Sequence, residues 1–110
     1  MADKMSIYAE FWPYYLGEHS NPLCRKLHFI GTTLALIAFT AFVITGEAIY
    51  LLLALFCGYA LAWTGHFFVE KNRPATFKYP LWSLISDFRM YFLWISGNLD
   101  KDLKSTIVKE

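Results

Sequence analysis

The three histidines of the chain, His19, His28 and His66, are the residues whose type and spacing best suit chemistry. His66 precedes Glu70 by four positions, and on a helix this spacing puts the ring and the carboxylate on one face, one turn apart. Metal ligands have this spacing, and so do simple hydrogen-bonded pairs. Imidazoles with a carboxylate suit Fe, Zn or Mn, and two or three such ligands with open positions suit Fe(II) and O₂ chemistry. The first hypothesis is therefore a metal site built from the three histidines, with Glu70 as a further ligand.

Two long apolar runs carry two of these histidines. Residues 27–45 and 48–69 contain no Asp, Glu, Lys or Arg. As helices they would be about 28 and 33 Å long, which matches a hydrocarbon core of about 30 Å. The alternative is a buried helical pair in a soluble bundle, but neither run has the polar face of a soluble helix. An Asn-Pro pair directly before the first run is typical of a helix start. We therefore predict transmembrane helices over 22–45 and 48–70.

The distribution of basic residues predicts the orientation of these helices. The turn at residues 45–48 has no Lys or Arg, whereas the outer ends carry Lys4, Arg25, Lys26, Lys71, Arg73 and Lys78. The positive-inside rule then puts both outer ends in the cytoplasm. His28 lies near the start of the first span, His66 near the end of the second, and His19 in the turn before, so all three lie at one membrane face. Each alone could be an interfacial ring, but ionisable residues within spans are costly and usually functional.

The flanking segments are aromatic. Residues 5–18 are predicted to form an interfacial helix, and residues 80–97 a helix with one apolar stripe. For that second helix a third span is possible only if Asp87 and Arg89 face protein, and a re-entrant or in-plane helix fits as well. The tail, 98–110, is polar and is expected to be a short helix or a frayed end. The predicted fold is thus all-α and integral to the membrane, with an antiparallel transmembrane hairpin plus flanking aromatic interfacial or additional membrane helices.

Length and composition set further bounds. The chain of 110 residues predicts one domain, 1–110, and its hydrophobic share of 56% exceeds that of ordinary soluble domains. A net charge of +1 gives no basic surface for nucleic acid. The sequence has no G-x-S-x-G elbow, no P-loop and no C-x-x-C pair. The absence of these patterns from the sequence argues against a serine hydrolase, a nucleotide enzyme and a structural zinc site.

Four further residues are candidates for binding a substrate. Arg25 and Arg73 lie near the same face as the histidines; the positive-inside signal explains most such residues, but either could bind the carboxylate of a lipid-derived acid. Asn72 either orients a ligand or caps a helix end. Asp87 is the fourth candidate, and either Glu70 or Asp87 could complete a metal shell.

Two blocks of the sequence resemble a known family. They read "FWPYYLGEHSNPLCRKLHFIGT" and "GHFFVEKNRPATFKYPLWSLISDFRMY", and they contain the patterns H-x-N-P-x-C-R-x-x-H-x-x-G and G-H-x-x-x-E-x-N-x-P-A. In combination, over about residues 11–97, they resemble the small membrane 2-hydroxy fatty acid dioxygenases of fatty-acid α-oxidation, formerly a family of unknown function. The resemblance implies an Fe(II)-dependent reaction with O₂. A 2-hydroxy fatty acid would lose its carboxyl carbon as CO₂ and leave a fatty acid one carbon shorter.

The resemblance also implies which residues act. Histidines essential in the family map to His19, His28 and His66, and the family often has a histidine where this chain has Tyr79. The site would lie at the cytoplasmic face of a bacterial inner membrane or an endoplasmic-reticulum membrane, with the acyl tail in the lipid bilayer. A homodimer would enclose such a site better than a two-span monomer. Two alternatives stay open: a non-enzymatic membrane scaffold or lipid-binding protein, and another metal-dependent lipid-modifying enzyme.

Overall fold

The computed structural model describes residues 5–108, with side chains up to residue 105. Within this range the chain forms helices and no strands, so the predicted all-α class is confirmed. The helices fall into two compact units. Residues 21–74 form one unit, which we call the helix-pair unit. The described residues on either side, 5–20 and 75–108, form the other, which we call the aromatic unit.

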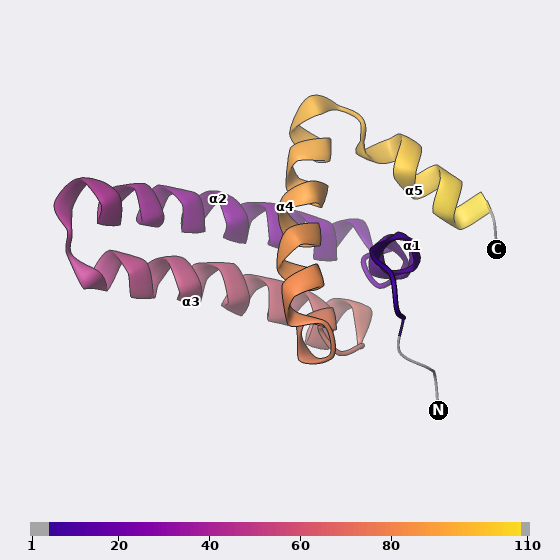
Figure 1. Ribbon diagram of the computed structural model, residues 1–110, viewed down its shortest axis with the longest axis horizontal. Helices are drawn as coiled ribbons and strands as arrows, with labels where there is room; N and C mark the ends of the chain where they lie inside the picture. The colour runs from indigo at the N-terminus through magenta and orange to yellow at the C-terminus, as the bar shows by residue number, and fades with distance from the viewer. Residues whose placement is uncertain (1–4, 109–110) are drawn as a thin grey trace. The chain divides into compact units, whose positions relative to one another are not determined.

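The helix-pair unit consists of two long helices and a terminal turn. These are α2 (Pro22–Thr45), α3 (Ala48–Thr64) and the π-helical turn η1 (Gly65–Glu70) that continues α3. Figure 1 shows α2 and α3 side by side, joined by a tight connection at one end. Gly46 makes that connection possible because its φ of 74° is left-handed. At the other end the predicted cap is confirmed: the side chain of Asn21 accepts a hydrogen bond from the Leu23 backbone N–H at 2.8 Å.

Glycines allow the two helices to approach closely. A Cβ atom on Gly31 of α2 would lie 2.9 Å from the carbonyl oxygen of Cys57 on α3. A Cβ atom on Gly65 would lie 2.9 Å from the Sγ of Cys24. Real Cβ contacts of this length do not occur, so any larger residue would push the helices apart. Both glycines lie within one helical turn of a histidine, and the close approach therefore governs the spacing of those side chains.

Both long helices have the length and composition of membrane spans. Pro22–Thr45 has 24 residues and a mean hydropathy of 2.1, and Ala48–Glu70 has 23 residues and a mean hydropathy of 1.7. Only 17% of the most apolar window of each is buried inside the chain, whereas the core helix of a soluble protein is mostly buried. The exposed apolar surface indicates association with a membrane, and membrane crossing stays a prediction.

The aromatic unit contains the remaining helices. They are α1 (Tyr8–Gly17), the single 3₁₀ turn η2 (Ala75–Phe77), α4 (Pro80–Ser96) and α5 (Leu99–Val108). α1 packs against α4 and α5, which also contact each other. Phe11 is fully buried at the centre of this packing. Its ring contacts five others, those of Tyr8, Tyr14, Tyr15, Tyr79 and Trp82. Aromatic packing of this kind stabilises the unit beyond the burial of its area.

Candidate metal centre

The helix-pair unit brings His28 and His66 together. His28 lies in the second turn of α2, and His66 is the second residue of η1. Their side chains are buried, their ring centroids are 5.0 Å apart, and the rings are perpendicular. One ligand nitrogen of each lies within 4.8 Å of the other, so the two rings can share one ion.

The π-helical turn positions His66. π-helical turns are rare and often occur at functional sites. Lys71 ends this one with a left-handed φ of 60°, and the chain then turns back. The Asn72 backbone N–H donates to the carbonyl oxygen of His66 at 2.9 Å, and the His66 ring bonds the Oδ1 of Asn72 at 2.7 Å. Two reciprocal hydrogen bonds therefore fix the orientation of the His66 ring.

The hydrogen bonds also select the tautomer of both rings. An amide or peptide oxygen can only accept, so the Nδ1 of each ring must donate. His28 Nδ1 donates to the Cys24 carbonyl oxygen at 2.9 Å, and His66 Nδ1 donates to Asn72. Nε2 would therefore be the ligand atom of each ring if the two rings bound a metal. A metal-binding histidine almost always donates its second ring N–H in this way.

His19 has the same arrangement in the aromatic unit. It directly follows the end of α1 and is almost fully buried. Its Nδ1 donates to the Tyr15 carbonyl oxygen at 2.7 Å, one of the last carbonyls of α1, which have no partner within the helix. The His19 ring also stacks on the Tyr15 ring, with centroids 4.1 Å apart. His19 is thus buried, as are His28 and His66, and each of the three rings hydrogen-bonds an oxygen of the chain through Nδ1.

The carboxylates of Glu70 and Asp87, the two candidates for completing a metal shell, accept hydrogen bonds from groups other than the histidines. Glu70 Oε2 accepts a hydrogen bond from the backbone N–H of Asn21 at 2.6 Å, which links the outer ends of the helix pair. The carboxylate of Asp87 accepts a hydrogen bond from the hydroxyl of Tyr15. Burial raises the pKa of Asp87 to about 7, although this hydrogen bond acts in the opposite direction. Among the described residues, neither carboxylate joins the histidines in a group that could hold a metal.

The candidate substrate residues differ in their surroundings. Arg25 is half-buried on α2, three residues before His28 and thus on the same helix face. Arg73 is exposed in the loop after η1. The side chain of Asn72 contacts a histidine, and that of Asp87 contacts Tyr15. Asn72 thus lies behind a candidate ligand, which is one of the two roles expected for it from the sequence, whereas the contact of Asp87 with Tyr15 was not expected.

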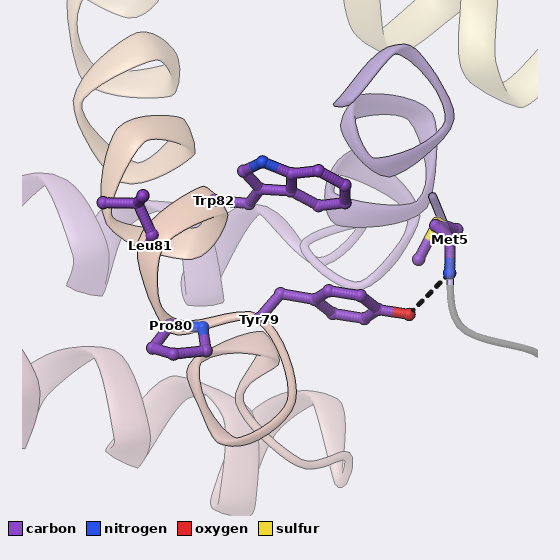
Figure 2. A pocket seen from close by; sticks show the side chains of 5 residues that line it. All are labelled: Met5, Tyr79, Pro80, Leu81 and Trp82. Atoms are coloured by element: carbon purple, nitrogen blue, oxygen red, sulfur yellow. Dashed lines mark hydrogen bonds between the residues drawn. The ribbon is translucent and has the colours of Figure 1, made fainter. Parts of the chain in front are cut away.

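Tyr79, where the resembling family often has a histidine, belongs to the core of the aromatic unit. Its ring stacks on Trp82 with centroids 5.7 Å apart, and its hydroxyl accepts a hydrogen bond from the backbone N–H of Met5 at 3.0 Å (Figure 2). These three residues line a shallow hollow of about 300 Å³ together with Pro80 and Leu81. The hydrogen bond and the stacking give Tyr79 a packing role in this unit.

Comparison with known proteins places the chain in a family. Residues 5–99 match the family described as 2-hydroxy-palmitic acid dioxygenase Mpo1-like. The chain belongs to this family. The resemblance seen in the two sequence blocks is therefore confirmed. No curated protein and no solved structure matches the chain. The family name indicates a dioxygenase of fatty-acid metabolism, and three buried histidines are consistent with a metal-dependent one.

Proposed function

We propose that the protein is an Fe(II)-dependent dioxygenase that acts on 2-hydroxy fatty acids. The reaction converts a 2-hydroxy fatty acid and O₂ into the fatty acid one carbon shorter, CO₂ and water, and it balances without an external reductant. One observation carries the proposal: the three buried histidines could hold a metal ion, and each hydrogen-bonds an oxygen of the chain through Nδ1. The family name supports the substrate class.

The donor set suits iron. Imidazole nitrogens suit Fe and Zn alike, and the dioxygenase family favours iron, which activates O₂ when bound. The proposal requires His19 to join the other two histidines. Only Ser20 separates His19 from Asn21, the cap of α2, so the Cα atoms of His19 and Asn21 are at most about 7.6 Å apart. Every geometry of this link keeps His19 near the start of α2.

We assign the remaining roles from their contacts. Arg25 binds the substrate carboxylate, because it is half-buried one turn before His28 on the same face. Asn72 orients His66, and Asp87 acts through Tyr15, whose carbonyl oxygen and ring hold His19. These two are positioning residues, since they contact candidate ligands or their partners. Arg73 is exposed and is the weaker candidate for the carboxylate.

The membrane placement follows from the apolar helices. We propose that Pro22–Thr45 and Ala48–Glu70 cross a bilayer, with the histidine end at the cytoplasmic face where the basic residues lie. The acyl chain of the substrate would then stay among lipid chains beside α2 and α3. The carboxyl end would reach Arg25 near the membrane surface. The homodimer expected from the sequence stays a prediction.

The reaction can be tested directly. The purified chain is loaded with Fe(II) without oxygen and then given 2-hydroxypalmitate and O₂, and the fatty acid and CO₂ are quantified. We expect pentadecanoic acid and CO₂ in equal amounts. Metal content is measured on the same samples.

Single substitutions separate the enzyme from the alternatives. His28→Ala and His66→Ala should abolish product and bound iron, while Thr64→Ala, an exposed change next to η1, should keep both. Iron-loaded protein that makes no shortened acid would contradict the dioxygenase proposal. Protein that binds fatty acid but never retains metal, with no effect of the histidine changes, would identify a lipid-binding protein instead.

A further inference from the structure

The outer face of α4 is apolar and exposed over the whole length of the helix. Six large side chains recur three and four residues apart and are 37–66% exposed. They are Leu81, Leu84, Ile85, Phe88, Phe92 and Ile95. No charged residue interrupts this outer stripe. Contiguous apolar patches of this kind mark interaction surfaces.

The inner face of α4 combines buried Met90 and Tyr91 with polar side chains where it packs in the aromatic unit. Ser83 and Ser86 are buried, and their hydroxyls bond those of Thr76 at 2.9 Å and Tyr8 at 2.8 Å. Asp87, on the same side, accepts the hydrogen bond from the Tyr15 hydroxyl. A helix on the surface of a soluble protein has its apolar stripe toward the core and its polar face toward water. In α4 the exposed face is the apolar one and polar side chains lie on the buried face, as expected for a helix whose outer surroundings are hydrocarbon.

We propose that α4 lies in the plane of a lipid bilayer, with its outer stripe among the acyl chains. Two further observations favour lipid over a protein partner. Exposed Lys78 lies two residues before α4, and exposed Lys101 lies in the first turn of α5, five residues after α4 ends, so cationic side chains can reach lipid phosphates beyond both ends of the stripe. The same chain also carries two helices long and apolar enough to cross a membrane. This surface would anchor the aromatic unit whatever reaction the chain performs.

An in-plane position fits α4 better than a third span. Its 17 residues are about 26 Å long, whereas a span needs about 20 residues. Arg89 lies near the middle of the helix and is exposed, with its guanidinium 4.1 Å from the centre of the Trp12 ring. In a span this charge would lie near the bilayer centre, where charged side chains are costly. In the in-plane position it lies beside the stripe and can extend to the headgroups.

Spin labels on the full chain in vesicles of neutral and anionic phospholipid test the proposal. A Cys57→Ala chain receives one cysteine at a time, by Leu84→Cys, Phe88→Cys or Ile95→Cys, and Lys104→Cys, at an exposed position of α5, serves as the control. Power saturation compares the access of O₂, which partitions into hydrocarbon, with that of a water-soluble nickel chelate. We expect O₂ access to dominate at the three stripe positions, at similar depths about 5–10 Å below the headgroups. The nickel chelate should dominate at position 104.

Each other outcome overturns the proposal. In a spanning helix the depths at positions 84 and 95 would differ by about 16 Å along the bilayer normal. Nickel access at the stripe would show a water-exposed face. Low access of both reagents would show a face covered by protein, and a short distance between labels at position 88 in two copies would identify a second chain as the cover. The Cys57→Ala chain without an added cysteine gives the background from Cys24, which is fully buried.

Discussion

Replacing Gly31 by Ala should force apart the two helices that carry His28 and His66. The new Cβ atom would lie 2.9 Å from the Cys57 carbonyl oxygen and 3.1 Å from the Leu61 Cβ. The first contact is with backbone, so relief requires movement of α2 against α3 by several tenths of an ångström. Overpacking of this kind costs about 1–3 kcal/mol. The higher helix propensity of Ala stabilises the helix by about 1 kcal/mol, so the free energy of unfolding should fall by about 0–2 kcal/mol in total.

Gly58→Ala is the matched control. It lies in the same helix pair, but its Cβ would meet only the Ala35 Cβ at 3.7 Å, an ordinary contact. This variant gains the helix propensity without the clash, and it should be more stable than Gly31→Ala by about 1–3 kcal/mol. Unfolding followed by circular dichroism in mild detergent measures the difference. Equal stabilities for the two variants would refute the close approach of α2 and α3.

Three further predictions concern the proposed site. Asn72→Ala removes the hydrogen bond that orients His66 and should weaken metal binding about 10–100-fold by titration, while Asn98→Ala, an exposed matched change, should leave it unaltered. Asp87→Asn should flatten the pH dependence of stability. The carboxyl of Asp87 has a pKa of about 7 in the folded chain instead of 3.8, so the native protein loses stability as the pH rises from about 4 to 7. The Asp87→Asn chain should lack this loss, and a stability profile unchanged by the substitution would contradict the reasoning. Arg25→Gln should raise KM for 2-hydroxypalmitate more than it lowers kcat, and Lys26→Gln, its exposed neighbour, should change neither.

The features that could be predicted from the sequence are those that depend on local pattern. The apolar runs predict two long helices because their lengths and lack of charge leave few alternatives. Asn21 and Pro22 predict the start of α2 because the cap is a contact between residues two positions apart. The combination of histidine and glycine patterns identified the family, which the comparison confirms.

The features that could not be predicted depend on the path of the backbone. An α-helix through Glu70 would place its carboxylate on the same face as His66, but this carboxylate accepts a hydrogen bond from the Asn21 backbone N–H just before α2. Asn72 reaches the His66 ring only because Lys71 adopts a left-handed conformation, which a lysine rarely does. The contacts of the other two rings are local in sequence. His19 and His28 each hydrogen-bond the backbone carbonyl oxygen of the residue four positions earlier.

The layout of the chain makes the helix pair an insertion. Residues 21–74 are one continuous stretch, whereas the aromatic unit is assembled from the stretches before and after it. The hydrogen bond from Asn21 to Glu70 holds the beginning of the inserted stretch close to its end. Segments whose ends lie close together can be inserted, excised or permuted with little loss of structure. The helix pair is thus a self-contained insertion, whose length can change while the aromatic unit keeps its own core.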